Sequence, residues 1–260
     1  MPEHEEDHEE EENESDEEKE LEIMNKLIHG YKLFRRHSHQ ALSQKLKKLS
    51  TEGQNCKVLC ISCCDSRYDP QLVFNAEPGE IFTVRNVANV VPKFDENTEE
   101  RKLGHHHGTC AAIEYAVKGL GVEAIVVLGH AQCGGCAHAL KLFGSSSGSG
   151  SDAATLEARR EPNEDGSGYV DAWCGLIKES VESVCENYDV DERLRQLEHE
   201  NVRKSVENVQ SFPFVRERIK NGSLQVFGGF FTIFSGGLCL MDPDTKKFER
   251  VNSDIEDSSE

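Results

Sequence analysis

The chain has 260 residues and a formal net charge of −19, so it can form one large domain or two small ones, and nucleic acid is not expected as a partner. It contains no run of about 18 apolar residues that could cross a membrane. Its N-terminus has neither the basic and apolar regions of a secretory signal nor the arginines of a mitochondrial transit peptide, so we expect a soluble cytoplasmic protein. Its ten cysteines are then expected to be thiols or metal ligands rather than disulfides.

The negative charge is concentrated at the start of the chain. Residues 1–20 hold thirteen acidic residues and one lysine, which leaves a net charge of −7 for the other 240 residues. Such a segment cannot bury apolar surface and repels itself, so we expect a disordered acidic tail over 1–20. A single domain is expected over 21–250, beginning with a helical arm over 21–50, and a flexible tail over 251–260.

The first half of the chain alternates between helical and strand patterns. Apolar residues recur at helical spacing from Leu21 to about Leu49, and Gly30 is expected to break this helix. Short apolar runs of the buried-strand type cover 57–62, 81–87 and 124–129. Between the last two runs, residues 108–121 show one apolar helical face, which a glycine ends.

The second half continues this pattern. A Gly/Ser-rich loop at 144–151 precedes helical stretches over 169–188 and about 191–209. Residues 224–242 look like a hairpin with its turn at Gly236–Gly237. Because strands alternate with helices, we expect an α/β fold: a mainly parallel central sheet flanked by helices, with the N-terminal helical arm.

Two clusters of chemically active residues follow predicted strands, at the strand ends where open α/β sheets bind their ligands. The first is Cys63-Cys64-Asp65-Ser66-Arg67, and the second is the stretch "GHAQCGG", which supplies His130 and Cys133. Thiolate and imidazole are the ligands that zinc prefers, and three protein ligands leave one position open for water. One cysteine of the first cluster, together with His130 and Cys133, would therefore form a catalytic rather than a structural zinc site.

Asp65 and Arg67 lie two residues apart, so on an extended segment both side chains point to the same side. A carboxylate beside a guanidinium stays ionised and can only accept hydrogen bonds. Next to a metal-bound hydroxide, Asp65 would accept the hydroxide hydrogen and direct an oxygen lone pair at the substrate. The pair could otherwise serve only to fix a loop.

Four motifs, CxDSR, PGEIFTVRNVANVV, HGTCAAIEYAV and VVLGHAQCGG, occur in this order and make the sequence between about 21 and 250 similar to β-class carbonic anhydrase. The resemblance implies the fold of that family and one Zn²⁺ per chain, held by Cys63, His130 and Cys133. It also implies Asp65 and Arg67 as the catalytic pair. The adjacent Cys64 should point to the opposite face and act as a packing thiol.

The resemblance extends to the substrate pocket. Gln54, Phe82 and Tyr115 fall where plant-like members place their pocket glutamine, phenylalanine and tyrosine, at the interface of an obligate dimer or dimer of dimers. Bacterial members with an inhibitory bicarbonate pocket instead have tryptophan and valine at the positions of Cys60 and Tyr68, so such a pocket is not expected.

Together these features predict zinc-dependent, reversible hydration of carbon dioxide to bicarbonate and a proton, through zinc-bound hydroxide oriented by Asp65 and Arg67. Two thiolates donate charge to the metal, so higher activity is expected on the alkaline side. Hydrolysis of carbon disulfide or carbonyl sulfide on the same zinc set is an alternative, and so is a non-catalytic zinc-binding interaction protein. Neither His138 nor the three histidines of "GHHHG" at 104–108 is expected to bind the metal.

Overall fold

A computed structural model describes residues 16–96, 107–144 and 167–252 of the chain, which falls into two units, Met1–Gly53 and Gln54–Glu260. Residues 1–15 of the tail expected over 1–20, most of the "GHHHG" segment and most of the Gly/Ser loop lie outside the described residues. Residues 16–20 of that tail are helical, which corrects the expectation of disorder there. Only Val251 and Asn252 of the expected C-terminal tail are described.

The first unit consists of two helices, α1 (Asp16–Arg36) and α2 (Ser38–Glu52). Two expectations are corrected here. Helix α1 begins at Asp16 and not at Leu21, and it continues through Gly30, since a glycine costs a helix only about 1 kcal/mol. The break falls at His37, which precedes α2 with φ −111°.

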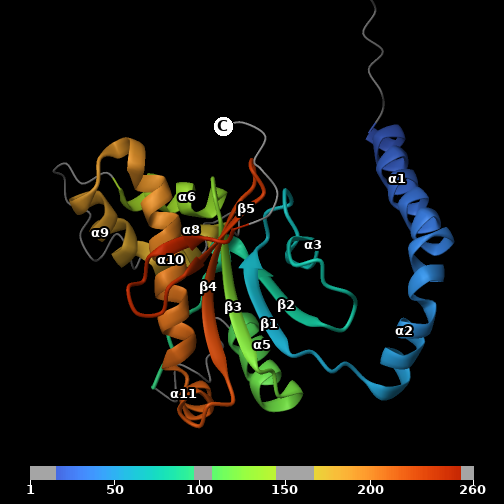
Figure 1. Cartoon of the computed structure of the whole chain (residues 1–260). Coiled ribbons are helices and arrows are strands. Elements are labelled where there is room, and N and C mark those ends of the chain that lie inside the picture. The colour runs from blue at the N-terminus through green and yellow to red at the C-terminus, as the bar shows by residue number, and fades with distance from the viewer. Residues whose placement is uncertain (1–15, 97–106, 145–166, 253–260) are drawn as a thin grey trace, which may run out of the picture. The chain divides into compact units, whose positions relative to one another are not determined.

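The second unit is built on a six-stranded sheet in the order β2-β1-β3-β4-β5-β6 (Figure 1). Strands β1 (Val58–Cys63), β2 (Ile81–Asn86), β3 (Ala124–His130) and β4 (Gln225–Thr232) pair in parallel. Strands β5 (Gly237–Met241) and β6 (Phe248–Arg250) add an antiparallel edge. The mainly parallel sheet expected from the sequence is confirmed.

Helices cover both faces of this sheet. They are α3 (Pro70–Val73), the short turn η1 (Val87–Asn89), α5 (His107–Glu114) continued by the π-helical η2 (Tyr115–Leu120), α6 (Gly134–Phe143), α8 (Tyr169–Cys174), η3 (Gly175–Ile177), α9 (Lys178–Asn187), α10 (Val190–Ser211) and α11 (Pro213–Lys220). None of the helices within the described ranges is long and apolar enough to cross a membrane.

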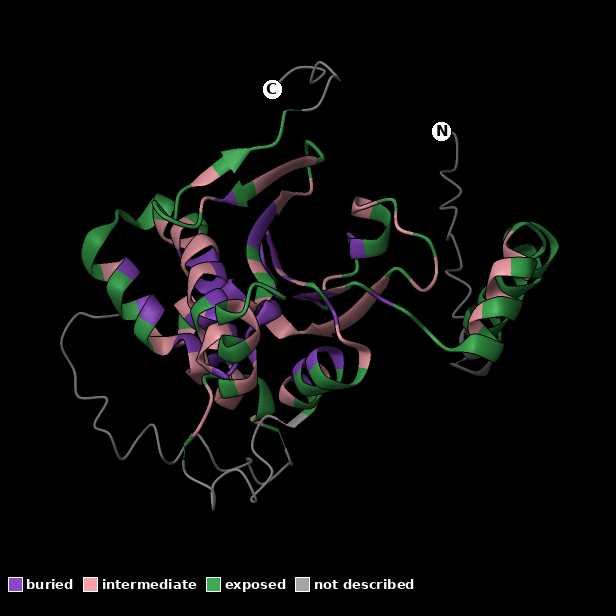
Figure 2. Cartoon of the chain, turned by 60° about the horizontal axis from the view of Figure 1, so that its bottom comes forward, coloured by how far each residue is buried: buried purple, intermediate pink, exposed green. Residues whose placement is uncertain are grey.

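The core has two parts, one on each face of the sheet. On β1, Leu59 and Ile61 pack into one cluster with Ile113 of α5, whereas Cys60 packs into the other with Ala139 of α6. Figure 2 shows the buried residues gathered on the central strands and on the inner surfaces of the helices. Because β1 is buried on both faces, it appears in the sequence as an apolar run in which Ser62 is the one polar residue.

Two motif glycines let helices approach the site closely. A Cβ atom on Gly129 would lie 2.5 Å from Val202 Cγ2 of α10, and one on Gly135 would lie 2.7 Å from Val87 Cγ1 of η1. Both contacts are too short for a side chain. The glycines therefore allow α10 to pack on β3, and η1 to pack on the start of α6.

The expected hairpin is formed by β4 and β5, but its turn covers residues 233–236 and so begins three residues before the predicted turn at Gly236–Gly237. Gly236 adopts a left-handed φ of +69°, which suits glycine, while Gly237 is already the first residue of β5. Strand β6, the short helix α3 and helix α11 were not anticipated.

Candidate metal centre

Three side chains meet at the carboxyl ends of two neighbouring strands. Cys63 is the last residue of β1, His130 is the last residue of β3, and Cys133 immediately precedes α6. Strands β1 and β3 are paired in parallel, so their ends lie side by side. The fold thus brings together the three residues that the family resemblance implied.

The ligand atoms of these residues are close and buried. They lie within 4.8 Å of one another, and no second group of this kind occurs within the described residues. The two Sγ atoms are 3.9 Å apart. His130 has its Nδ1 atom 3.0 Å from the carbonyl oxygen of Ala131, which leaves Nε2 as the atom available for a metal.

A zinc ion fits this set. His130 Nε2 is buried and has no hydrogen-bond partner. The neighbouring Cys133 thiol and burial raise the pKa of Cys63 to about 12, and contact with the Cys136 thiol raises the pKa of Cys133 to about 12. Two such thiols ionise together only around a cation, and sulfur and imidazole nitrogen are the donors that zinc prefers.

Asp65 and Arg67 form a bidentate ion pair beside the ligands. Arg67 Nε donates to Asp65 Oδ1 at 2.9 Å, and Arg67 Nη2 donates to Oδ2 at 2.6 Å. The Oδ2 atom is also 3.8 Å from His130 Nε2. The hydrogen bonds from Arg67 lower the pKa of Asp65 to about 2, so this carboxylate is ionised throughout the neutral range.

Two further residues, Tyr68 and Arg85, support the loop between Cys63 and Tyr68, and neither role was expected from the sequence. The buried hydroxyl of Tyr68 accepts the Cys63 N–H at 3.1 Å and donates to the Leu128 carbonyl at 3.3 Å. Arg85 of β2 donates to the carbonyls of Cys63 at 2.8 Å, Asp65 at 2.6 Å and Tyr68 at 3.0 Å. A charged residue within an otherwise apolar strand pattern was the only signal for Arg85.

The position of Cys64 corrects one expectation. It lies outside the ligand cluster, as expected, but it is exposed and so is not a packing thiol. The reason is that β1 ends at Cys63, and the chain turns away from the sheet at the next residue. All ten cysteines are free.

The three residues expected in the substrate pocket lie at the other end of the sheet in the same chain. Phe82 is in register with Leu59 of β1, four residues before the pair formed by Cys63 and Asn86, which corresponds to about 13 Å along the strands. Gln54 is exposed and precedes β1. Tyr115 is exposed too, with its ring 5.7 Å from that of Phe82. One chain therefore brings Phe82 and Tyr115 together but does not place them at the metal ligands.

The histidine on α6, His138, has a partner other than a metal. His138 Nε2 lies 2.7 Å from Asp171 Oδ1 of α8, so its partner is a neighbouring helix and not the metal.

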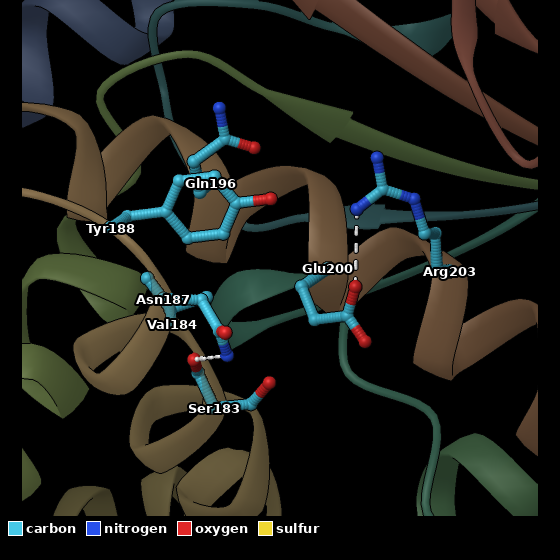
Figure 3. Close-up of a pocket in the computed structure, with 7 residues that line it drawn as sticks. All are labelled: Ser183, Val184, Asn187, Tyr188, Gln196, Glu200 and Arg203. Carbon is cyan, nitrogen blue, oxygen red and sulfur yellow. Dashed lines mark hydrogen bonds and ion pairs between the residues drawn. The ribbon is translucent and has the colours of Figure 1, made fainter.

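A separate hollow of about 400 Å³ lies between α9 and α10 (Figure 3). Part of its polar lining is paired internally: Arg203 contacts Glu200 at 3.1 Å, and Asn187 Nδ2 donates to the Ser183 carbonyl at 2.7 Å. None of the metal ligands lines it, so this hollow is not part of the centre.

Comparison with known proteins agrees with this site. The profile of the carbonic anhydrase family matches residues 58–238. A carbonic anhydrase of Synechococcus elongatus is 33% identical over 219 residues, covering 82% of this chain and 70% of the relative. The chloroplastic β carbonic anhydrase 5 of Arabidopsis thaliana is 31% identical, over 69% of this chain and 52% of the relative.

Solved structures show the same fold. The β-carbonic anhydrase CcaA superposes with a TM-score of 0.72 at 26% identity, covering 90% of this chain and 94% of its own. A β-carbonic anhydrase of Sordaria macrospora, described as tetrameric, superposes with a TM-score of 0.58 at 28% identity, covering 87% of this chain and 98% of its own.

The parallel sheet and its Cys-His-Cys cluster define a zinc enzyme of the α/β class. The chain belongs to the carbonic anhydrase family, and its relatives are of the β class and include plant proteins. It is a zinc-dependent carbonic anhydrase, which hydrates carbon dioxide reversibly to bicarbonate and a proton.

Proposed function

We propose that Asp65 and Arg67 are the catalytic pair of this enzyme, and that a second copy of the chain completes its substrate pocket. The observation that carries the first part is the position of the Asp65 carboxylate, which is held by two hydrogen bonds from the Arg67 side chain and lies 3.8 Å from His130 Nε2.

Zinc, when bound, lowers the pKa of a coordinated water towards neutrality and so supplies a nucleophile. Asp65 is ionised and can only accept hydrogen bonds. It therefore orients any O–H group beside the ligands by accepting a hydrogen bond from it. Arg67 keeps Asp65 ionised and fixes its direction. Arg67 is itself anchored, because its Nη2 also donates to the Gln132 carbonyl at 2.8 Å.

The second copy is proposed for the remaining pocket. Gln54, Phe82 and Tyr115 supply an amide donor and an apolar wall suited to a small linear molecule such as carbon dioxide, but within one chain they lie at the opposite strand ends from the ligands. In a homodimer or a dimer of dimers, these residues of one copy would lie beside the zinc site of another copy and form its substrate pocket. The tetrameric state named for the Sordaria relatives supports such an assembly.

Two thiolate ligands must stay reduced to hold zinc, which supports a reducing compartment such as the cytoplasm as the working location.

The dyad is tested with Asp65→Asn, a substitution of nearly the same size that removes the charge and one acceptor. Zinc should remain bound at the wild-type stoichiometry while kcat for carbon dioxide hydration falls by about 100-fold or more. Zinc is quantified by atomic absorption and kcat by stopped flow on the same sample. Unchanged kcat would mean that the pair only fixes a loop.

A further inference from the structure

Helix α10 carries a line of polar residues on a side that faces the protein interior. Its members are spaced three or four residues apart, as residues on one helical face are, and each bonds to the backbone of a loop beneath the helix. They are Glu198, Asn201, Ser205 and Asn208. The hollow of Figure 3 is lined by Gln196, Glu200 and Arg203, which belong to the other side of the same helix.

Glu198 holds the loop that carries one zinc thiolate. Its carboxylate, 4% exposed, accepts the N–H of Cys133 at 2.7 Å and also the N–H of Gln132. Gln132 has a left-handed φ of +56°, which residues with a side chain adopt rarely and keep only when their surroundings hold them. The same residue offers the carbonyl that anchors Arg67. Glu198 therefore fixes the backbone from which Cys133 points.

Asn201, one turn further along α10, holds the backbone beside the other thiolate. Its Nδ2 donates to the Ala88 carbonyl at 2.6 Å. Ala88 is again left-handed, with φ +61°, and its own N–H points at Cys63 Sγ at a distance of 3.3 Å. An N–H bond to a metal thiolate stabilises the charged sulfur and orients it.

The rest of the line contacts a segment further from the ligands. Ser205 accepts the Val91 N–H at 3.1 Å, and Asn208 donates to the Val91 carbonyl at 2.7 Å. These bonds fasten α10 to the fold without touching a residue next to a zinc ligand. A variant that lacks one of these bonds therefore shows what loosening α10 does by itself, without changing a bond beside a zinc ligand.

We propose that Glu198 and Asn201 are positioning residues for the two zinc thiolates: Glu198 sets the backbone of Cys133, and Asn201 sets the Ala88 N–H that bonds to Cys63. The inference rests on the zinc site but not on the proposed role of Asp65 and Arg67, because its test needs no turnover.

The test compares Glu198→Ala and Asn201→Ala with Asn208→Ala, a control that also removes one hydrogen bond between α10 and the backbone beneath it, in a partly buried position. Zinc affinity is measured by competition with a chelator on the full chain. The thiolate-to-metal absorption is recorded after replacing zinc with cobalt. The first two variants should bind zinc roughly 10–100-fold more weakly and shift the cobalt spectrum, as expected when partners of metal ligands are removed. Asn208→Ala should match the wild type in both measurements.

Glu198→Gln serves as the conservative variant, because its amide oxygen can still accept one N–H. It should recover part of the zinc affinity lost in Glu198→Ala, and together with Asn201→Ala it carries the test if Glu198→Ala does not fold. Wild-type zinc affinity and cobalt spectra in Glu198→Gln and Asn201→Ala would overturn the inference. So would an equal loss of affinity in Asn208→Ala.

Discussion

Cys63 and Cys64 are adjacent in the chain and differ sharply in their surroundings. Cys63 is buried with its sulfur 3.9 Å from that of Cys133, whereas Cys64 is exposed. Only the first can share a metal ion with His130. The chemistry of the centre thus depends on where β1 ends.

This difference predicts the outcome of a matched pair of substitutions. Cys63→Ser should lose zinc and with it carbon dioxide hydration, since a serine hydroxyl is a poor ligand for zinc. Cys64→Ser should keep one zinc per chain and wild-type activity. Metal analysis of the purified variants checks this. If Cys64→Ser lost zinc and Cys63→Ser kept it, Cys64 and not Cys63 would be the zinc ligand.

At the residue scale, the ligands and the Asp65–Arg67 pair could be predicted because each lies in a short local motif. Tyr68 and Arg85 could not, because their roles depend on backbone groups that only the parallel pairing of β1 with β2 and β3 brings within reach. Every residue has a backbone carbonyl, so the sequence does not show which carbonyl a distant side chain will bind.

Helix α10 shows the same limit at the scale of an element. Its apolar periodicity predicted a helix over about 191–209, close to the observed Val190–Ser211. Polar residues at helical spacing are typical of a solvated face, so the burial of Glu198, Asn201 and Ser205 could not be inferred. The role of these polar residues depends on the loops that pack against α10, and their hydrogen bonds to those loops cannot be read from the helix alone.

The same helix contributes a histidine whose burial makes stability depend on pH. The ring of His199 lies 4.3 Å from that of Phe230 and 4.5 Å from that of Phe248. Burial, with smaller contributions from Arg203 and Arg195, lowers the pKa of His199 from 6.5 to about 4. The folded chain therefore keeps this ring neutral at a pH where the unfolded chain protonates it.

Stability should consequently be lost as the pH falls from about 6.5 towards 4, because there the unfolded state binds more protons. His199→Phe removes this loss while keeping an aromatic ring. Between about pH 7 and pH 5 the wild type should lose up to about 2 kcal/mol relative to the variant, in urea unfolding of both proteins. Acid release of zinc affects both proteins alike, so equal losses would contradict the account of His199.

At the scale of the whole molecule, the proposed pocket requires two copies of the chain. Gln54, Phe82 and Tyr115 lie at the opposite strand ends from Cys63, so the zinc of one copy would be served by the pocket residues of another. The resemblance to plant-like members suggested this arrangement. The register of β1 and β2 supplies the physical reason for it.

Complementation between two impaired variants tests the shared pocket. Asp65→Asn and Gln54→Ala should each have low activity alone. A mixed dimer of the two would contain one site with an intact Asp65 and an intact Gln54 from the other copy. Co-expression with two different tags, followed by purification of the mixed species, should recover roughly half of the wild-type activity. Recovery no greater than the average of the two variants would place both residues in the site of one chain.

Zinc held by Cys63, His130 and Cys133 is the group on which carbon dioxide hydration by this chain depends. The most direct test of this dependence is stopped-flow hydration across pH on protein whose zinc content has been measured. We expect one zinc per chain and a hydration rate that rises towards alkaline pH, because two thiolates donate charge to the metal. A full complement of zinc with no hydration from acid to alkaline pH would contradict this expectation.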